Sequence, residues 1–268
     1  MKVIKIEELK KIQLDILTEI DTFCRKNNIK YFLGFGTLLG AIRHKGYIPW
    51  DDDIDIVMLR NDYDKFIKEF SKNDRSIYRV QSGDIDKTFL YPYAKIDDTR
   101  TTLIENANNS SNIGINIDLF PLDIIPEDSK KAKILLMKSK VWNCIYILKY
   151  VKIKHGRNIF KNIILILSHF LLGIIKYRTI KKNIIINAQK YKNYTSKYCG
   201  NVVMTDKWNG GIQEVESFSE VLYVDFETIK VPIPCGYDAF LKGCYGDYME
   251  LPPLSERVSH HSFYAYWK

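Results

Sequence analysis

The first third of the chain alternates between helical and extended spacing of its apolar residues. From Ile6 to Asn27 the apolar positions fall three or four residues apart, which predicts an amphipathic helix. Residues 30–36 and 53–59 are apolar runs of strand length, and residues 37–44 between them predict a short helix. A further helix is predicted from Asn61 to Phe70. This mixture of helices and strands predicts an α/β fold.

Strand-forming segments continue on both sides of a long basic segment. We predict a helix at residues 237–245 and further strands at residues 76–81, 88–96, 113–119, 217–224 and 230–233. The basic segment is predicted to be mostly helical to about Tyr194. The sequence therefore predicts a core with a short mixed sheet formed by residues 1–127 and 206–268, and a basic helical insertion at residues 128–205.

Three carboxylates alternate in a short run near residue 50. Asp51, Asp53 and Asp55 would share one face of an extended segment, because successive side chains point to opposite faces. Such close charges repel each other unless a cation neutralises them, and carboxylate oxygens suit Mg²⁺ or Mn²⁺. The alternatives are an exposed acidic turn and a calcium loop. An EF-hand is excluded because its glycine and glutamate positions, counted from Asp51, hold Ile56 and Asp62.

A glycine turn precedes this acidic run. Gly36 allows a phosphate to approach the backbone, and Thr37 offers a hydroxyl at the start of a helix, where free N–H groups favour anions. Arg43, near the end of the same helix, can bind a phosphate through two N–H groups; the alternative is a surface arginine. A phosphate cradle followed by an acidic strand suits metal-dependent transfer of a phosphorylated group.

The stretch GTLLGAIRHKGYIPWDDDIDI, residues 36–56, resembles the nucleotidyltransferase superfamily. The signature of that superfamily is a Gly-Gly/Ser turn followed by an Asp-x-Asp strand. The sequence of this stretch is most similar to the LicD family of phosphocholine transferases, which is related to fukutin and fukutin-related protein. The resemblance covers roughly residues 28–125 and 206–261, including YGDYMELPP at residues 245–253. The chain departs from the superfamily in having Gly36-Thr37 for Gly-Ser and fifteen residues between Thr37 and Asp53.

The resemblance implies a CDP-linked donor such as CDP-choline, Mg²⁺ and a glycan acceptor. It also implies a third carboxylate on a neighbouring strand, a place that Asp118 fits, whereas Asp123, beyond Pro121, is expected to be a loop or cap residue. Lys95 lies on a strand expected to adjoin the site; the alternative is a solvated strand face. By the same likeness we expect substrate-facing roles in the C-terminal region for Tyr245, Asp247 and His260.

The sequence thus predicts an enzyme that transfers phosphocholine, or a similar phospho-alcohol, to a sugar hydroxyl of a cell-surface glycan or teichoic acid precursor. The residues expected to hold the metal are Asp51, Asp53, Asp55 and Asp118, of which the last three are also assigned as catalytic. If choline is the alcohol, its quaternary ammonium needs aromatic faces. The candidates for that role are Trp50, Tyr91, Tyr93, Tyr245 and Tyr248.

Two other functions remain open from the residues alone. One is a nucleotidyltransferase that moves a nucleotide from a nucleoside triphosphate onto protein, RNA or a small molecule. The other is a non-catalytic adaptor at a membrane surface. The chain shows no aromatic-rich single-strand surface and no RNA-binding module, so no nucleic acid partner is expected.

Charge is distributed unevenly. Residues 129–205 hold 17 Lys or Arg and no Asp or Glu, in a chain with 40 Lys or Arg and 32 Asp or Glu. Within this segment residues 163–175 are almost entirely apolar, but a run of about 13 residues is too short to span a bilayer. We predict a helix lying on an anionic membrane surface, close to a lipid-linked acceptor. The alternative is a buried core helix.

The remaining features concern the compartment. Five cysteines without a C-x₂-C pair predict a reduced, cytoplasmic chain. The chain start passes directly into an amphipathic helix, so we expect no cleaved leader. Together with the basic segment, these features predict a cytoplasmic protein held peripherally at the inner face of the cell membrane.

Overall fold

A computed structural model of the chain describes residues 2–73, 76–105, 112–151, 159–205, 211–258 and 263–268. Its α-helices are, in chain order, α1 (Ile6–Asn27), α2 (Phe35–Arg43), α3 (Arg60–Phe70), α4 (Ser129–Tyr150), α5 (Ile159–Leu172), α6 (Tyr177–Ala188) and α7 (Tyr237–Tyr245). Its strands are β1 (Lys2–Val3), β2 (Phe32–Leu33), β3 (Asp55–Leu59), β4 (Tyr78–Gln81), β5 (Ala94–Asp98), β6 (Thr101–Glu105), β7 (Asn116–Ile125), β8 (Tyr198–Gly200), β9 (Ile212–Glu214), β10 (Val221–Phe226), β11 (Ile229–Pro234) and β12 (Phe263–Trp267). Short 3₁₀ turns are η1 (Gln189–Tyr191), η2 (Val215–Phe218) and η3 (Leu254–Glu256).

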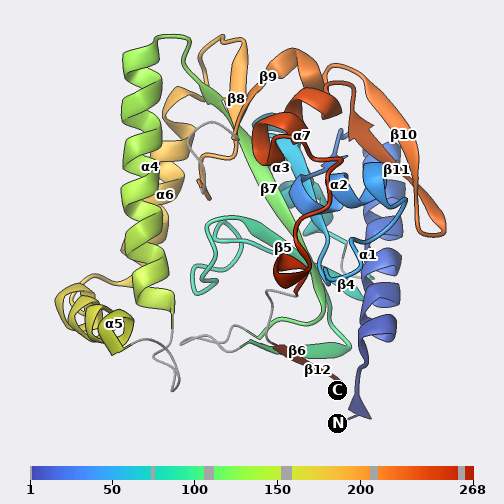
Figure 1. The fold of residues 1–268 in the computed structure, drawn as a ribbon, viewed down its shortest axis with the longest axis horizontal. Coiled ribbons are helices and arrows are strands. Elements are labelled where there is room, and N and C mark those ends of the chain that lie inside the picture. The colour runs from blue at the N-terminus through green and yellow to red at the C-terminus, as the bar shows by residue number, and fades with distance from the viewer. Residues whose placement is uncertain (1, 74–75, 106–111, 152–158, 206–210, 259–262) are drawn as a thin grey trace.

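The central sheet is mixed, as the sequence predicts. Its strands follow the order β2-β3-β7-β5-β4, and β3 and β7 run parallel while the other neighbours are antiparallel. Helix α1 packs against β5 and β7, and α3 packs against β3 and β7. Figure 1 shows β7 crossing the middle of the molecule, with α4 and α6 on one side and α1 on the other. The α/β class is therefore confirmed.

Helix α1 shows how the apolar pattern becomes packing. Leu9, Ile12, Ile16 and Ile20 recur on one face of the helix and are all buried in the core. Acidic residues occupy the first turn and basic residues the last, in agreement with the helix dipole. The helix ends at Asn28, whose φ of 52° is the left-handed conformation that commonly closes a helix.

Several predicted strand boundaries were wrong. The strand predicted at residues 88–96 forms only at Ala94–Asp98, since Pro92 lacks an N–H and cannot join a ladder in full. The strand predicted at 217–224 is divided into η2 and β10. Strands β6 and β12 were missed. They pair with each other, and β12 also pairs with β1, so each owes its conformation to a partner distant in the chain.

The interpretation of Asp123 as a loop or cap residue was wrong. Strand β7 continues through Pro121 to Ile125, and Asp123 is buried within it. Its two carboxylate oxygens accept hydrogen bonds from Nε and Nη2 of the buried Arg60, both at 2.7 Å. Pro121 lies between the residues that pair with β5 and those that pair with β8. The strand therefore passes the proline at the point where its neighbour on one side changes.

The basic segment packs closely against the rest of the molecule. At its start, Asp128 caps α4 by accepting hydrogen bonds from the N–H groups of Lys130 and Lys131 at 2.9 and 3.0 Å. At its end, β8 pairs with the far half of β7. Between these points, Ile180 and Ile184 of α6 are fully buried in the main core. The proposed domain boundaries near residues 128 and 205 stay a prediction.

Among the described residues, no single helix is long and apolar enough to cross a bilayer. One bent pair, Asn162–Leu172 with Tyr177–Tyr191, meets that test by length and composition.

Candidate active site

The acidic run leads directly into β3, at the edge where β3 meets β7. Asp55 lies opposite Asp118 in the parallel register, and the N–H of Asp118 donates to the carbonyl of Ile54 at 3.0 Å. The run alternates as predicted, although regular strand begins only at Asp55. Asp52 and Ile54 are buried, whereas Asp51, Asp53, Asp55 and Asp118 keep partial contact with solvent. These four carboxylates are the residues that the sequence assigned to a metal.

The turn before α2 is fastened to the acidic strand. The N–H of Gly34 donates to the carbonyl of Asp55 at 2.9 Å, and the N–H of Asp55 donates to the Thr37 hydroxyl at 2.8 Å. Thr37, which is buried, therefore positions Asp55. Phe35, at a φ of 43°, holds a conformation that costs a non-glycine residue energy. Its ring makes edge contacts with the rings of Phe120 and Phe240.

Gly36 is the point where the turn touches the acids. A Cβ atom at this position would stand 3.1 Å from Oδ2 of Asp51. Since this distance is tighter than ordinary contact, a side chain here would displace the carboxylate. Glycine thus leaves both an open backbone and room for Asp51.

A Gly36→Ala protein should lose about tenfold in turnover, since small misplacement of groups at a reacting centre is costly. It should nevertheless unfold at the same denaturant concentration or a higher one, because alanine favours a helix more than glycine does. Steady-state kinetics and urea unfolding of the same preparation measure both effects. Full activity in the variant would show that the position of Asp51 has no bearing on the reaction.

The acids of the site affect one another's ionisation. Burial, followed by the charges of Asp53, Asp118 and Asp51, raises the pKa of Asp55 well above its ordinary value, and Lys95 only partly offsets this. Within the described part of the chain, no three or more His, Cys, Asp or Glu side chains already stand as a metal-binding group. The carboxylates nevertheless fit a divalent cation in chemistry, because their mutual repulsion is what such an ion would relieve.

Lys95 extends from β5 towards β7 and is buried. Its Nζ donates to Oδ1 of Asp118 at 2.6 Å and to Oδ1 of Asn116 at 3.2 Å. The same ammonium lies 4.6 Å from the ring centroid of Tyr91 and 5.7 Å from that of Tyr93. The structure therefore places Lys95 beside the acids, where it neutralises Asp118. The faces of these two tyrosine rings already carry a cation.

A small cavity opens beside these groups. Its volume is about 80 Å³, and its lining includes Asp53, Asp118, Lys95, Asn116 and Gln13. Because a water molecule occupies about 30 Å³ of liquid, the cavity suits a few waters or a hydrated ion rather than a nucleotide. Gln13, which the sequence reasoning missed, donates to the carbonyls of Asp52 and Asn116, both at 3.2 Å. It thereby joins the acidic loop to β7.

Arg43 is engaged by the segment that follows α7. Its Nη1 donates to the carbonyl oxygens of Tyr248 at 2.7 Å and Glu250 at 3.1 Å. Burial, and then the charge of Arg257, lowers the pKa of Arg43. Arg257 itself lies over the Trp50 ring, 5.6 Å from its centroid. Two guanidinium groups thus meet next to the acidic loop, and only Arg43 was assigned from the sequence. The available signal was that Arg257 is the single basic residue between positions 245 and 258.

The other C-terminal candidates lie in different surroundings. Tyr245 is 41% exposed, although desolvation by the surrounding protein, and then the charges of Cys244, Asp55, Asp51 and Asp53, raise its pKa. Tyr248 is buried and donates to Oδ1 of Asp238 at 2.9 Å, so it packs rather than lining an opening. Asp247 is exposed. His260 lies outside the described residues.

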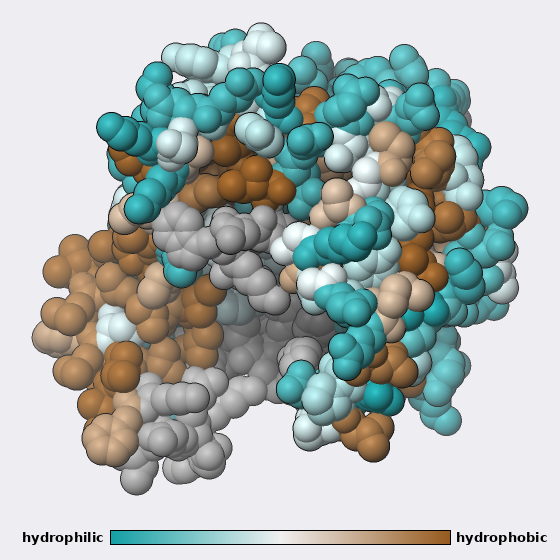
Figure 2. Space-filling model, turned by 45° about the horizontal axis from the view of Figure 1, so that its top comes forward, coloured by the Kyte–Doolittle hydropathy of each residue, from teal (hydrophilic) through white to brown (hydrophobic). Residues whose placement is uncertain are grey.

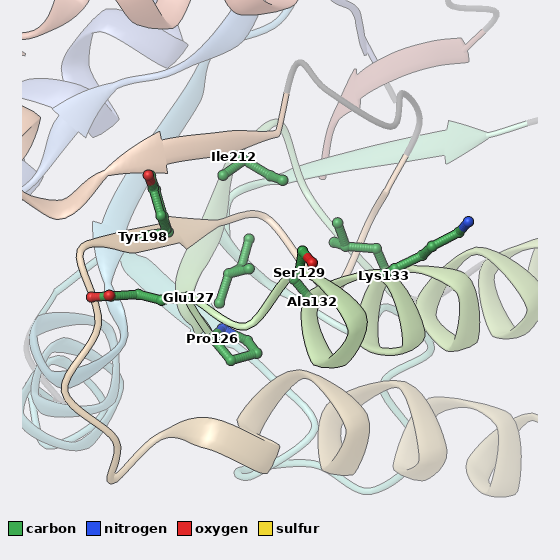
Figure 3. A pocket seen from close by; sticks show the side chains of 9 residues that line it. Pro126, Glu127, Ser129, Ala132, Lys133, Tyr198 and Ile212 are labelled. Atoms are coloured by element: carbon green, nitrogen blue, oxygen red, sulfur yellow. The ribbon is translucent and has the colours of Figure 1, made fainter.

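A larger cavity lies away from the acids, at the far end of β7 (Figure 3). It has a volume of about 360 Å³ and is formed between the start of α4, β8 and β9. Most of its lining is apolar, including Ile125, Pro126, Leu136 and Ile212. Seven residues of extended chain, roughly 23 Å, separate Ile125 from Asp118, so this cavity takes no part in chemistry at the acids.

Comparison with known proteins identifies relatives of this chain. A family model described as the LicD/FKTN/FKRP nucleotidyltransferase domain matches residues 28–152. The chain is 32% identical to the lipopolysaccharide cholinephosphotransferase LicD of Haemophilus influenzae over 274 residues, covering 99% of both chains. It is also 38% identical to an uncharacterised protein of Rickettsia typhi over 82 residues, or 30% of this chain and 26% of that one. An uncharacterised protein of Rickettsia prowazekii is 46% identical over 61 residues, or 23% of this chain and 20% of that one. The expected resemblance is confirmed, and the chain belongs to the LicD family.

Proposed function

We propose that this protein is a metal-dependent phosphocholine transferase that uses CDP-choline and a glycan hydroxyl. The observation that carries the proposal is the pairing of Asp55 with Asp118 on adjacent parallel strands, beside an open glycine turn. A relative that matches over its full length is a lipopolysaccharide cholinephosphotransferase, which supports transfer of phosphocholine in particular. We further propose that the core built around β3 and β7 is that of a nucleotidyltransferase.

In the proposed reaction, the acceptor oxygen forms a bond to the phosphorus of phosphocholine as the bond from that phosphorus to the CMP oxygen breaks. The four carboxylates would hold Mg²⁺ or Mn²⁺, an ion that would neutralise phosphate charge when bound; they are Asp51, Asp53, Asp55 and Asp118. Lys95 holds Asp118 in position through their ion pair. The acceptor hydroxyl loses its proton to a carboxylate of this cluster, for which Asp118 is our candidate.

The remaining residues of the site position the donor. The N-terminus of α2, with Gly36 and Thr37, offers N–H donors to the diphosphate. Arg43 and Arg257 add positive charge on the side of the C-terminal segment. For choline, the candidate rings near the acids are Trp50, Tyr91, Tyr93 and Tyr245. Lys95 lies over Tyr91 and Tyr93, and Arg257 lies over Trp50, so choline would replace a basic side chain at any of these three rings.

The test is a panel of CDP-alcohols with Mg²⁺ and candidate glycan acceptors, read as CMP release. We expect CDP-choline to be used in preference to CDP-glycerol and CDP-ribitol, because neither of these presents a quaternary ammonium to an aromatic face. The matched control is the same panel with EDTA. Equal use of all three donors would rule out choline selectivity. Pyrophosphate release from a nucleoside triphosphate, without CMP release, would replace the proposal by nucleotide transfer.

A lipid-linked glycan is the acceptor that we propose. Such an acceptor would place the reaction at the inner face of the cell membrane.

A further inference from the structure

Helix α5 exposes apolar side chains around most of its circumference. Phe160 is 77% exposed, Phe170 is 82% exposed and Ile174, just beyond the helix, is 92% exposed. Ile164, Leu167 and Leu171 are each more than half exposed, whereas Leu165 is buried. Figure 2 shows the resulting hydrophobic area on the side of the molecule where α5 lies in Figure 1. The alternative of a buried core helix is therefore wrong.

The turn after α5 is fixed to the body of the protein. Nζ of Lys149, near the end of α4, donates to the carbonyl of Leu172 at 2.9 Å and also to that of Ile175. The hydroxyl of Tyr177 donates back to the carbonyl of Lys149. Beyond this turn, α6 is anchored by the buried Ile180 and Ile184. The apolar surface of α5 is thus presented from a fixed base, and α6 is committed to the protein core.

Positive charge borders this apolar surface. Lys176, Arg178 and Lys182 follow α5 directly, and all three are exposed. Residues 129–205 contain no acid, and Asp84, from outside this segment, lines a pocket together with Arg178 and Lys182. Apolar residues rimmed by basic ones match a bilayer with anionic headgroups, where the apolar side chains enter the acyl region and the charges meet phosphate. A second copy of this chain would bring like charges together, which disfavours it as the occupant.

We propose that α5 docks the protein on an anionic phospholipid surface, lying in the plane of the interface, with Lys176, Arg178 and Lys182 at the level of the headgroups. The inference stands on exposure and charge and does not depend on the donor chemistry.

The experiment is sedimentation of the full chain with vesicles of phosphatidylglycerol and phosphatidylcholine, or of phosphatidylcholine alone. Binding should appear with the anionic vesicles and weaken at high salt. Changing Phe170, Leu171 and Ile174 together to Gln should lower partitioning by about tenfold or more. Changing Lys176, Arg178 and Lys182 together to Gln should lower it by roughly a hundredfold at low salt.

The matched control removes the same number of charges elsewhere. Lys11 and Lys26 of α1 and Lys68 of α3 are exposed and lie away from α5, so changing them together to Gln should weaken binding far less. All variants should unfold like the wild type, and should keep their activity on a soluble acceptor. Equal binding by the α5 variant and the wild type would overturn the inference, as would dimerisation through α5 without vesicle binding. Loss of transferase activity in every protein, with vesicle binding retained, would count against the proposed function alone.

Discussion

Asp53→Asn and Asp55→Asn proteins should each fold normally and lose at least about a thousandfold in transfer rate. The amide keeps the shape of the side chain but removes the charge that would hold a divalent cation at the transferred phosphate. The reason for choosing these two residues is their position where β3 meets β7, beside the glycine turn. The measurement is CMP release from CDP-choline at saturating Mg²⁺.

The same Asp55→Asn change should make the metal-free protein more stable. Because the folded-state pKa of Asp55 is raised, this group favours the folded state most below its ordinary pKa. That contribution is lost as the pH rises through the folded-state pKa. Asparagine does not titrate, so the excess stability of the variant in EDTA should grow from mildly acidic to neutral pH. Thermal unfolding of both proteins across this range measures the difference.

Two outcomes of these measurements would contradict the assignment of the carboxylates to a metal site. An Asp53→Asn protein that keeps more than about a tenth of wild-type activity would remove that residue from the metal site. An Asp55→Asn protein that is less stable than the wild type at neutral pH would mean that the carboxylates do not repel one another. Asp52→Asn is the matched control, because Asp52 belongs to the same run but alternates with the acids that were assigned to the metal.

Asp123→Ala should destabilise the protein by about 3–5 kcal/mol, because removal of one partner from a buried ion pair leaves the other charge without compensation. Here the uncompensated charge would be Arg60, whose side chain is 7% exposed. Equilibrium unfolding in urea measures the loss. A second variant, Arg60→Met with Asp123→Leu, should regain much of it, since a buried ion pair can be replaced by apolar residues at little cost.

The control for this pair is the exposed contact between Lys230 and Asp225, which has the same 2.7 Å separation. Asp225→Ala should leave the unfolding free energy essentially unchanged, because solvent screens such pairs. If Asp123→Ala unfolds at the same urea concentration as the wild type, Arg60 must bond to another acceptor. The candidate is Asp64, whose Oδ1 lies 3.5 Å from Nη1 of Arg60.

The sequence was most informative where a residue type and its spacing carried the structure. The alternation of Asp51, Asp53 and Asp55 predicted a shared face, and the apolar period of residues 6–27 predicted α1 to the residue. The assignment of Asp118 to a neighbouring strand came from the family likeness. The position of Asp118 opposite Asp55 depends on β3 and β7 being parallel neighbours. The local sequence pattern does not predict which strands are neighbours.

What the sequence could not predict depends on contacts between distant segments. Arg60 and Asp123 are 63 residues apart, and only the parallel pairing of β3 with β7 brings them together. Gln13 and Arg257 resemble ordinary surface residues in the sequence, and their positions beside the acidic loop follow from α1 and from the C-terminal segment. Pro121 was taken as a strand end because proline lacks the N–H that a strand ladder needs. In the folded sheet β7 changes its neighbour from β5 to β8 around this residue, and the local sequence does not predict that change.

The opposed directions of β7 and α4 set a limit on reach. From Asp118 strand β7 rises roughly 23 Å to Ile125, and α4 then returns over about 33 Å to the base that presents α5. Figure 1 shows α4 returning from the end of β7 towards α5, so by these lengths the acids and the docking helix lie towards the same end of the molecule. With α5 resting on a bilayer, the site would serve the sugars nearest the lipid end of an acceptor. A hydroxyl several sugar units farther out would stand above it, so the height of the enzyme over the membrane would select which sugar is decorated.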